Sequence, residues 1–600
     1  MLIVGLNAYH GDVAAAVLRD GVLIAALEEE RFCRVKHVAG FPARAIERGL
    51  AMAGARPEEV DIWAVARGRR VHLLQKAWFA LTHRPGGALL AQYRNTAGKS
   101  AGIADVIATT FNLDHATVAA RLRYVEHHPA HLASAYRTSG LDEAACCAID
   151  GFGDFVSVST AHGRHGRLDV LDRVYFPHSL GMIYLAITQY LGFKKFGDEY
   201  KVMGLAPYGT PRHTDAIHRL VRLDPGGGFR LNLEYFRHWT GQVTMTWNAG
   251  EPIVPDVFTD DLIDLLGPGR QPDEPVTGQH EDLAASVQRV FEDAAFHVLR
   301  GVHEKVPVET LCLAGGCAMN SVANGKIRQH TPFRHVFIQP AAGDNGTALG
   351  AALEAWHGSG DRPIGPRMEH AYWGTSYTDA EIAAVIRASG VVGQGRCQLT
   401  TIETESALCE ATAQRLAAGE VVGWYQGRME WGARALGNRS ILADPRRRDM
   451  RDVINQKIKF RERFRPFAPS VLAEAIDEYF VDAVHDPFMI QVYPVRPEKR
   501  DVIPAVTHVD GSARIQTVER SQNARYYDLI AEFEKRTGVP LVINTSFNVR
   551  GEPIVCSPED AYNCFLQTHM DALVMGDTVL EKRDGRSFPE LGPKREFEPD

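Results

Sequence analysis

Four residues that could hold a metal ion fall in three separate segments of the chain. In EHHPAH, His127 and His131 stand four residues apart, and on a helical turn this spacing puts both imidazoles on one face, as a metal pair requires. Proline between them is compatible with the first turn of a helix. Asp150 ends a predicted strand before Gly-Phe-Gly, and Asp344 lies in a Gly-Asp-Asn-Gly turn after another strand. Both positions are where open sheets place ligands.

This donor set narrows the choice of metal without deciding it. Two imidazoles and two carboxylates, with no thiolate, suit Fe(II), Mn(II) or Zn(II). Each residue also has an ordinary interpretation, because paired histidines are often simply packed or hydrogen-bonded and aspartates are common in turns. The two carboxylates beside the histidine pair favour the metal site.

A pair of glycines after a predicted strand is a second candidate site. In LAGGCAMNS, Gly315 and Gly316 end the strand and a helix opens towards Asn320, so its free N–H groups could bind phosphate. A packing turn is an equally good interpretation, because glycine pairs after strands are common. The sequence lacks GxxxxGK[ST], which argues against a P-loop enzyme and favours an ATPase with a cleft.

The third feature is a basic stretch in an acidic chain. The chain has 74 acidic and 66 basic residues, a net charge of -8, yet residues 428–465 hold twelve Lys or Arg and five acids. This excess fits a highly charged anion, with arginine forks for phosphate or carboxylate. A solvated helix face is the alternative, particularly for residues 446–448. Residues 459–470, KFRERFRPFAPS, alternate arginine with phenylalanine, which predicts a strand with inward-pointing charges.

Composition excludes several function classes. At 600 residues and 45% hydrophobic content, the chain can build more than one core. Its acidic balance argues against nucleic acid or an anionic membrane as a partner, and against RNA as the anion of the basic stretch.

Residues 176–193 are interrupted by polar residues and predict a buried helix, and the N-terminus has no basic signal region. We expect a cytoplasmic protein whose nine cysteines, which lack metal or redox spacing, are reduced.

The elements that must position these residues follow an α/β rhythm. Residues 2–29 predict three strands with a hairpin at Asp20-Gly21, and residues 143–176 repeat the pattern. Residues 41–66 predict a helix and a strand between them. Two such units indicate a duplicated domain of the actin-like ATPase kind, with halves that face each other across a cleft. Two unrelated hairpins are the alternative.

Further elements suggest a second domain. Residues 283–302 predict a long amphipathic helix, followed by two units of strand, glycine turn and helix. Residues 357–366 are rich in glycine and proline and predict a domain boundary. Beyond it lie the predicted strands VVGWYQ and PLVINTSF and a helix that begins at Thr404. We expect domains at 1–357 and 368–582 and an extended or mobile tail at 583–600.

Several long motifs occur in an order that we know from one family. They are GLNAYH, EHHPAH, AIDGFGD, GDEYKVMGLAPYG, LAGGCAMNS, AAGDNG, RALGNRSILADPR, FRPFAP and NTSFNVRGEPI. Together they resemble the carbamoyltransferases that include the nodulation-factor and tobramycin enzymes. The resemblance extends over residues 1–580.

The resemblance implies an N-terminal domain like the tRNA threonylcarbamoyl-transferring ATPases and a YrdC-like C-terminal domain. In such enzymes the C-terminal domain makes carbamoyl adenylate from carbamoyl phosphate and ATP with Mg²⁺, releasing pyrophosphate. The adenylate then passes inside the protein to the metal site, where a hydroxyl of a small-molecule acceptor attacks and AMP leaves. The implied partners are therefore small molecules and neither nucleic acid nor a membrane. The resemblance is compatible with an oligomer.

The resemblance also assigns roles to residues. His127, His131, Asp150 and Asp344 would hold Fe(II), with other divalent metals possible. His10 and Lys36 would lie near the acceptor and the carbamoyl group, and His10 is the candidate base, since imidazole accepts a proton near neutral pH. Here His10-Gly11-Asp12 replaces the adjacent His-Asp of the family. Six residues would bind carbamoyl phosphate and nucleotide. Arg434 and Lys459 would also be catalytic, and the other four are Arg465, Arg514, Asn544 and Ser546.

Two other functions make different demands on the sequence. A tRNA-modifying carbamoyl transferase should have a basic docking face, which the acidic balance does not favour. A non-enzymatic actin-like ATPase would keep the glycine loops but would not need the basic stretch or the NTSFN loop.

Overall fold

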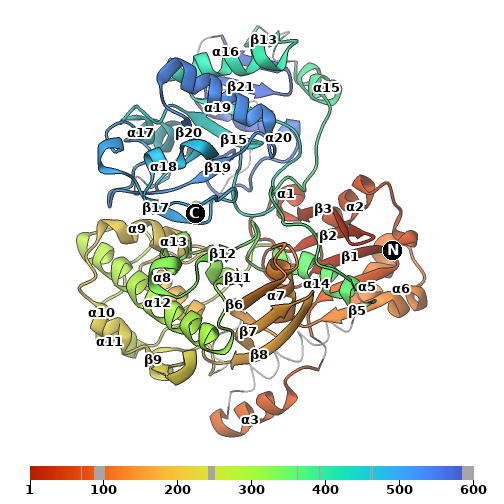
Figure 1. Ribbon diagram of the computed structural model, residues 1–600, viewed down its shortest axis with the longest axis vertical. Coiled ribbons are helices and arrows are strands. Elements are labelled where there is room, and N and C mark those ends of the chain that lie inside the picture. The colour runs from red at the N-terminus through yellow and green to blue at the C-terminus, as the bar shows by residue number, and fades with distance from the viewer. Residues whose placement is uncertain are drawn as a thin grey trace. The chain divides into compact units, whose positions relative to one another are not determined.

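The computed structural model divides the chain into two compact units, Met1–Met368 and Glu369–Asp600. It describes residues 1–583 except 69, 85, 87–101, 241–242, 244–249, 361, 391, 393–394, 460 and 463 (Figure 1). The tail predicted at 583–600 therefore lies outside the described residues, apart from Arg583. Both units mix helices and strands, so the α/β class is confirmed.

The first sheet of the N-terminal unit is built around the strand that opens the chain. This strand pairs antiparallel with the hairpin that follows it and parallel with the fourth strand. Asp20 and Gly21 both have positive φ, as the predicted hairpin turn requires. In spatial order the strands are β3 Val22–Glu28, β2 Ala14–Arg19, β1 Leu2–Asn7, β4 Ile62–Ala66 and β5 Leu122–Val125.

The second sheet repeats the first in both order and direction. Its first strand pairs antiparallel with the following strand and parallel with a strand much later in the sequence. The shared topology is what a duplicated domain predicts, and two unrelated hairpins would not produce it. In spatial order the strands are β8 Arg167–Tyr175, β7 Val156–Arg164, β6 Glu143–Gly153, β11 Thr310–Ala314 and β12 His335–Phe337.

Two helices of the N-terminal unit pack on each other and on the sheets. They are α7 (His127–Tyr136) and α14 (Gly346–His357). Gly350 permits their close approach, because a Cβ there would overlap the carbonyl of Ala130. The remaining helices are α1 Glu30–Cys33, α2 Ala43–Met52, α3 Leu73–His83, α5 Ile103–Phe111, α6 His115–Arg121, α8 Leu180–Tyr190, α9 Glu199–Leu205, α10 Thr214–His218, α11 Asp260–Leu266, α12 Gly278–Lys305 and α13 Ser321–His330.

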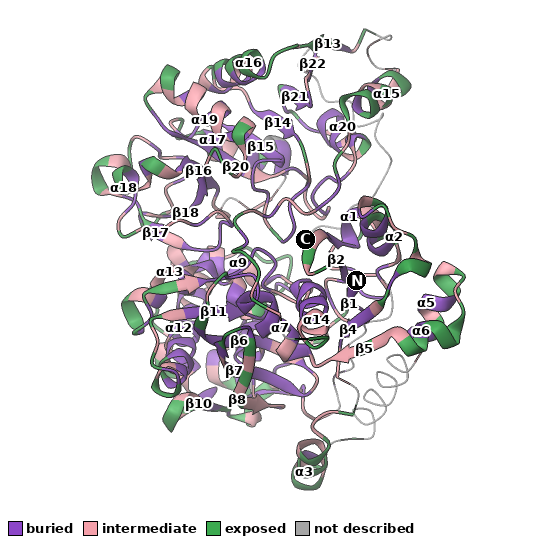
Figure 2. Cartoon of the chain, turned by 45° about the vertical axis from the view of Figure 1, so that its right-hand side comes forward, coloured by how far each residue is buried: buried purple, intermediate pink, exposed green. Residues whose placement is uncertain are grey.

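The C-terminal unit contains one large mixed sheet with a core of its own (Figure 2). In spatial order its strands are β13 Cys397–Thr401, β22 Thr578–Lys582, β21 Ala572–Met575, β14 Val422–Tyr425, β15 Arg439–Ala443, β20 Leu541–Ser546, β16 Ala468–Leu472 and β19 Gln516–Val518. A small separate pair is formed by β17 Val492–Pro494 and β18 Ser512–Arg514. The helices are α15 Asp379–Ser389, α16 Glu405–Ala417, α17 Met450–Ile454, α18 Ile476–Tyr479, α19 Ala524–Thr537 and α20 Pro558–Gln567.

The strand predicted over residues 459–470 is wrong for most of its length. Asn455–Lys459 forms a π-helical turn, and β16 begins only at Ala468. Proline at position 466 has no N–H to donate to a ladder, which helps to keep the intervening segment irregular. Phe460 and Arg463, which belonged to the predicted alternation, lie outside the described residues.

The predicted burial of residues 176–193 is confirmed by α8, which is buried along its length. All nine cysteines are free thiols, and seven of them are buried. Within the described part of the chain, no helix has both the length and the apolar character that crossing a bilayer demands.

Candidate metal centre and anion site

The predicted histidine pair lies at the start of α7, which begins at His127 and carries Pro129 in its first turn. Proline is tolerated there because the N–H it lacks would have no partner within the helix. The spacing of four residues brings the Nε2 atoms of His127 and His131 to 3.0 Å from each other. Both side chains are buried. The helix therefore presents two nitrogen donors to one point.

Two carboxylates complete the cluster. Oδ1 of Asp344 lies 3.4 Å from Nε2 of each histidine, and Oδ2 of Asp150 lies 3.4 Å from Nε2 of His127. One donor atom from each of the four residues falls within 4.8 Å of all the others. Asp150 does not end its strand as predicted: β6 continues to Gly153, with its register to β7 broken after Ile149. That irregularity releases Asp150 from the regular ladder.

The chemistry of this cluster fits a divalent cation. Oδ1 of Asp344 is buried and has no hydrogen-bond partner, and a buried carboxylate is costly unless it is paired or coordinates a metal. Burial lowers the pKa of His127, but the nearby carboxylates of Asp150 and Asp344 prevail and raise it to about 10. The cluster thus favours a positive charge. His127, His131, Asp150 and Asp344 are the residues that would hold the ion, and their types leave its identity open.

His10 lies beside this centre. Its Nδ1 is 2.5 Å from Oδ2 of Asp344, and its ring centroid is 5.2 Å from that of His127. Nδ2 of Asn7 donates to the carbonyls of Gly11 and Asp12, at 2.9 and 3.0 Å, and holds the loop. The extra glycine therefore leaves His10 in contact with a metal-site carboxylate.

Asp12, separated from His10 by that glycine, takes a different partner. Its Oδ1 lies 2.7 Å from Nδ1 of His37. Lys36 precedes His37, and its ammonium lies 5.4 Å from the centroid of the Tyr200 ring on α9. The structure thus places Lys36 beside the Asp12–His37 pair rather than among the four metal-site residues.

Asp154, which the sequence reasoning missed, anchors the histidine helix. Its Oδ2 accepts a hydrogen bond from the backbone N–H of His127 at 2.9 Å and another from Gly68. The adjacent Gly153 is also required, because a Cβ there would overlap the ring of His127. Both residues belong to the AIDGFGD motif, which was the available signal.

We expect Asp154→Ala to weaken metal binding by roughly ten- to a hundredfold, because partners that orient a ligand typically contribute that much. Asp154→Asn keeps an oxygen that can accept from His127 and should lose less. Titration of the metal-free protein with Fe(II) measures both variants against Asp169→Ala, a control at an exposed position on β8. Wild-type affinity in Asp154→Ala would show that Asp154 does not position His127.

The glycine pair supports the metal centre directly. Gly316 donates its N–H to Oδ1 of Asp150 at 2.8 Å, and Gly315 donates to the carbonyl of Ala342 at 2.9 Å. Gly315 has a φ of +90°, and a Cβ there would overlap the carbonyl of Ile149. The pair is therefore also a packing turn between the ends of β6 and β11.

The helix expected directly after the glycines begins later. A 3₁₀ turn, Gly316–Met319, comes first, and α13 begins at Ser321 with Asn320 as its cap. Oδ1 of Asn320 accepts from the N–H of Ala323 at 3.0 Å, and its Nδ2 donates to Gln288, also at 3.0 Å. The phosphate role of Gly315, Gly316 and Asn320 stays a prediction.

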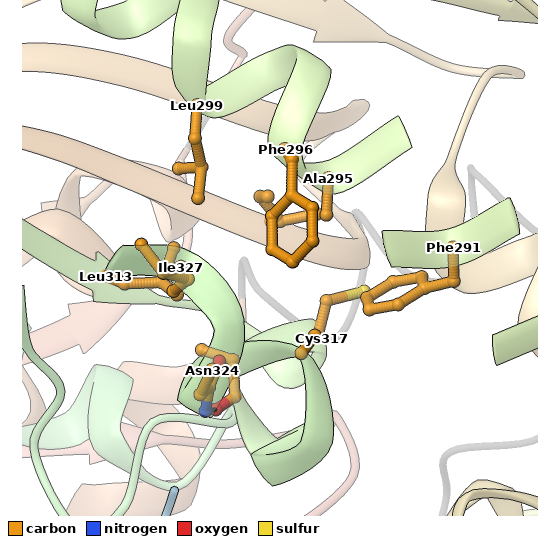
Figure 3. Close-up of a pocket in the computed structure, with 11 residues that line it drawn as sticks. Phe291, Ala295, Phe296, Leu299, Leu313, Cys317, Asn324 and Ile327 are labelled. Carbon is orange, nitrogen blue, oxygen red and sulfur yellow. Dashed lines mark hydrogen bonds between the residues drawn. The ribbon is translucent and has the colours of Figure 1, made fainter. Parts of the chain in front are cut away.

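A small cavity of about 20 Å³ lies next to this turn (Figure 3). Phe291 and Phe296 of α12 approach it from one side, and Cys317 and Ile327 from another. Its volume suits no more than a single water molecule, and its lining is almost wholly apolar. It is too small to hold a nucleotide.

A second cluster of predicted residues forms around Lys459 in the C-terminal unit. The ammonium of Lys459 is buried and donates to both the carbonyl and the hydroxyl of Ser546, the hydroxyl at 3.2 Å. It also donates to the carbonyl of Asn548 at 3.0 Å and to its Oδ1 at 2.7 Å. Asn548, four residues after Asn544 in the NTSFN loop, was missed by the sequence reasoning.

Partly buried arginines and one buried asparagine lie around the same region. Burial, then Arg434 and Arg461, holds the pKa of Arg514 well below its usual range, and Arg465 adds to the effect. Burial and then Arg461 likewise lower the pKa of Lys459. Such crowding of like charge is relieved when a phosphate binds.

Asn544 connects this region to the sheet. Its Nδ2 donates to the carbonyl of Ala435, beside Arg434, at 3.1 Å, and to Oγ of Ser470 at 2.9 Å. Its Oδ1 and the Nε of Arg514 are buried without hydrogen-bond partners. All six residues assigned to carbamoyl phosphate and nucleotide are thus linked within one unit by contacts or by charge.

Other arginines of the basic stretch are structural. Arg446, Arg447 and Arg448 pair with nearby carboxylates. Arg439 is fully buried, donates to backbone carbonyls and lies 3.7 Å from the ring centroid of Tyr425. Residues 446–448 lie in the non-helical segment before α17 and Arg439 lies in β15, so these arginines do not form the helix face that was the alternative. The candidate anion site is restricted to the second part of the stretch and to Arg434.

Comparisons with known proteins cover nearly the whole chain. The family descriptions "Carbamoyltransferase N-terminus" and "Carbamoyltransferase C-terminus" match residues 2–353 and 413–582. The chain is 42% identical to the uncharacterized protein sll1178 of Synechocystis sp., over 97% of this chain and 96% of that protein. It is 39% identical to nodulation protein NolNO of Sinorhizobium fredii, over 96% of this chain and 80% of the relative. Among solved structures, T. kodakarensis HypF gives a TM-score of 0.29 at 15% identity, over 60% of this chain and 48% of that one. A likeness this weak carries no inference about the site.

Proposed function

Because the chain belongs to the carbamoyltransferase family, we propose that it transfers a carbamoyl group from carbamoyl phosphate to a hydroxyl of a small-molecule acceptor. The proposed donor is carbamoyl adenylate. Carbamoyl phosphate would lose its phosphate as inorganic phosphate, the carbamate so formed would displace pyrophosphate from ATP with Mg²⁺, and AMP would leave when the carbamoyl group is transferred. The observation that carries this proposal is the presence of two chemically different clusters in two separate units of the chain. One consists of imidazoles and carboxylates, which suit a cation, and the other of arginines and a lysine, which suit an anion.

The C-terminal unit, with a YrdC-like role over residues 368–582, would form carbamoyl adenylate. Its cluster of Arg434, Lys459, Arg465 and Arg514 can neutralise phosphate charge, which is the main demand of phosphoryl chemistry. Asn544 and Ser546 on β20 add hydrogen-bonding groups beside the ammonium of Lys459.

The N-terminal unit, with an actin-like role over residues 1–357, would carry out transfer. A divalent ion, Fe(II) in our proposal, would supply Lewis acidity towards phosphate oxygens when bound by His127, His131, Asp150 and Asp344. The contact between Asp344 and Nδ1 of His10 fixes the orientation of the His10 ring. His10 in that orientation is our candidate to accept the hydroxyl proton of the acceptor.

Pyrophosphate release tests the adenylating half before the acceptor is known. With ATP and Mg²⁺, we expect pyrophosphate and AMP to form only when carbamoyl phosphate is added. The carbamate that remains after carbamoyl phosphate loses inorganic phosphate is the group that displaces pyrophosphate. Coupled pyrophosphate detection and chromatography of the nucleotides measure both products. Formation of ADP and phosphate, independent of carbamoyl phosphate, would instead support an actin-like ATPase.

A further inference from the structure

Helix α3 turns an apolar face to solvent, and no other element of the described residues covers that face. Leu73, Leu74, Trp78 and Leu81 are 59, 83, 69 and 74% exposed, and their spacing places them on one side of the helix. They make up four of the thirteen large hydrophobic side chains that are exposed among the described residues. Figures 1 and 2 show α3 at the end of the N-terminal unit, beyond β8. A patch of this kind usually marks an interaction site.

The opposite side of α3 is firmly packed. Phe79 is buried, with its ring centroid 5.8 Å from that of Phe155 and 5.0 Å from that of Phe176. His83 stacks on Phe79 at 4.7 Å. The helix is therefore held to the unit by one face, and the exposure of the other does not result from a detached segment.

The sequence segment that contains α3 differs in charge from the rest of the chain. Residues 62–104 contain seven Lys or Arg and no Asp or Glu, although the whole chain has a net charge of -8. Arg70 and Arg84 are exposed at the two ends of the helix. The carboxylates that interact with Lys76 are Asp154 and Glu126, and both already have partners: backbone N–H groups for Asp154, and His72 for Glu126. The surface of α3 is thus apolar with basic ends.

We propose that α3 docks the protein on an anionic lipid bilayer, with Leu74, Trp78 and Leu81 in the interface and Arg70 and Arg84 at the headgroups. Leucine and tryptophan on one face with arginine at the margin is the pattern of an interfacial helix. A second copy of the chain fits less well, because antiparallel pairing of two such helices would bring Arg70 of one against Arg84 of the other. The chain as a whole is acidic, so the rest of its surface should not be attracted to an anionic membrane. The proposed docking therefore concerns α3 alone.

Vesicle flotation of the full-length protein tests this proposal. We expect it to float with phosphatidylcholine vesicles that contain phosphatidylglycerol and not with pure phosphatidylcholine, and high salt should weaken the association. The triple variant Leu74→Ser, Trp78→Ser, Leu81→Ser should bind at least about tenfold less, because it removes the apolar contribution. Ile253→Ser, which removes an apolar side chain that is 64% exposed elsewhere, is the matched control and should bind like the wild type.

The double variant Arg70→Gln, Arg84→Gln keeps the apolar face and should weaken binding to the anionic vesicles alone. Its result stands even if the serine variant folds poorly. The proposal would be overturned if the wild type floated with neither kind of vesicle. It would also be overturned if the wild type and both variants floated equally. Self-association that is lost in the serine variant, without vesicle binding, would overturn it in favour of a second copy as the occupant. Capture of an acidic protein without vesicle binding would likewise overturn it.

Discussion

The double variant His127→Ala, His131→Ala will lose its bound metal and its carbamoyl transfer. Both nitrogen donors of the centre come from these side chains, 3.0 Å apart on α7. Two carboxylates alone would hold a borderline divalent ion poorly. We expect substoichiometric metal by elemental analysis and a fall in transfer of at least about a thousandfold.

The proposed adenylating half provides an internal control for this variant. Its residues lie in the other unit, so carbamoyl-phosphate-dependent pyrophosphate release should continue at a rate near that of the wild type. His165→Ala, which removes an exposed histidine of the N-terminal unit, should change neither the metal content nor the rate of carbamoyl transfer. Full metal content in the double variant would refute the ligand assignment, even if transfer were lost.

The local elements could be predicted because their signals are local. Residues 2–29 contain short apolar runs on both sides of an Asp-Gly turn, and the structure confirms β1, β2 and β3 there. The same signals at residues 143–176 give β6, β7 and β8. The recurrence of one pattern was enough to predict the duplication.

The metal centre could be predicted only in part. Helical spacing explains why His127 and His131 face one point. Asp344 lies in a turn after β12, as expected, but Asp150 lies inside β6 at the break in its register and not at the end of the strand. The contact between His10 and Asp344 joins residues 334 positions apart, and no local pattern encodes it. Only the resemblance suggested His10.

The anion site shows a different limit. The basic stretch was visible as composition, but composition does not distinguish Arg439, which donates to carbonyls inside the core, from Arg434 near Arg514. The inward charge of Lys459 was expected on a strand, whereas a π-helical turn places it. Contacts from β20 and the loop after it decide which charges face inward, and those contacts exist only in the folded sheet.

Lys459→Ala will abolish most adenylate formation. Lys459 is buried, and its ammonium lies among the oxygens of Ser546 and Asn548, near Arg461 and Arg465. Removal of a positive charge that faces a phosphate in a water-poor site costs about two to three orders of magnitude. We therefore expect carbamoyl-phosphate-dependent pyrophosphate release to fall by about a hundred- to a thousandfold.

Loss of packing could imitate loss of charge, and two further variants separate these causes. Lys459→Met keeps most of the buried stem without the ammonium, so it should fall nearly as far as the alanine variant while its thermal unfolding stays close to the wild type. Arg448 belongs to the same basic stretch, is exposed and pairs with Asp501. Arg448→Ala should therefore leave pyrophosphate release unchanged. Metal content should stay at the wild-type level in all three, because the metal-site residues lie in the other unit. Wild-type pyrophosphate release by Lys459→Met would mean that the ammonium does not face the reacting phosphate, and the anion site would then have to be sought among the arginines alone.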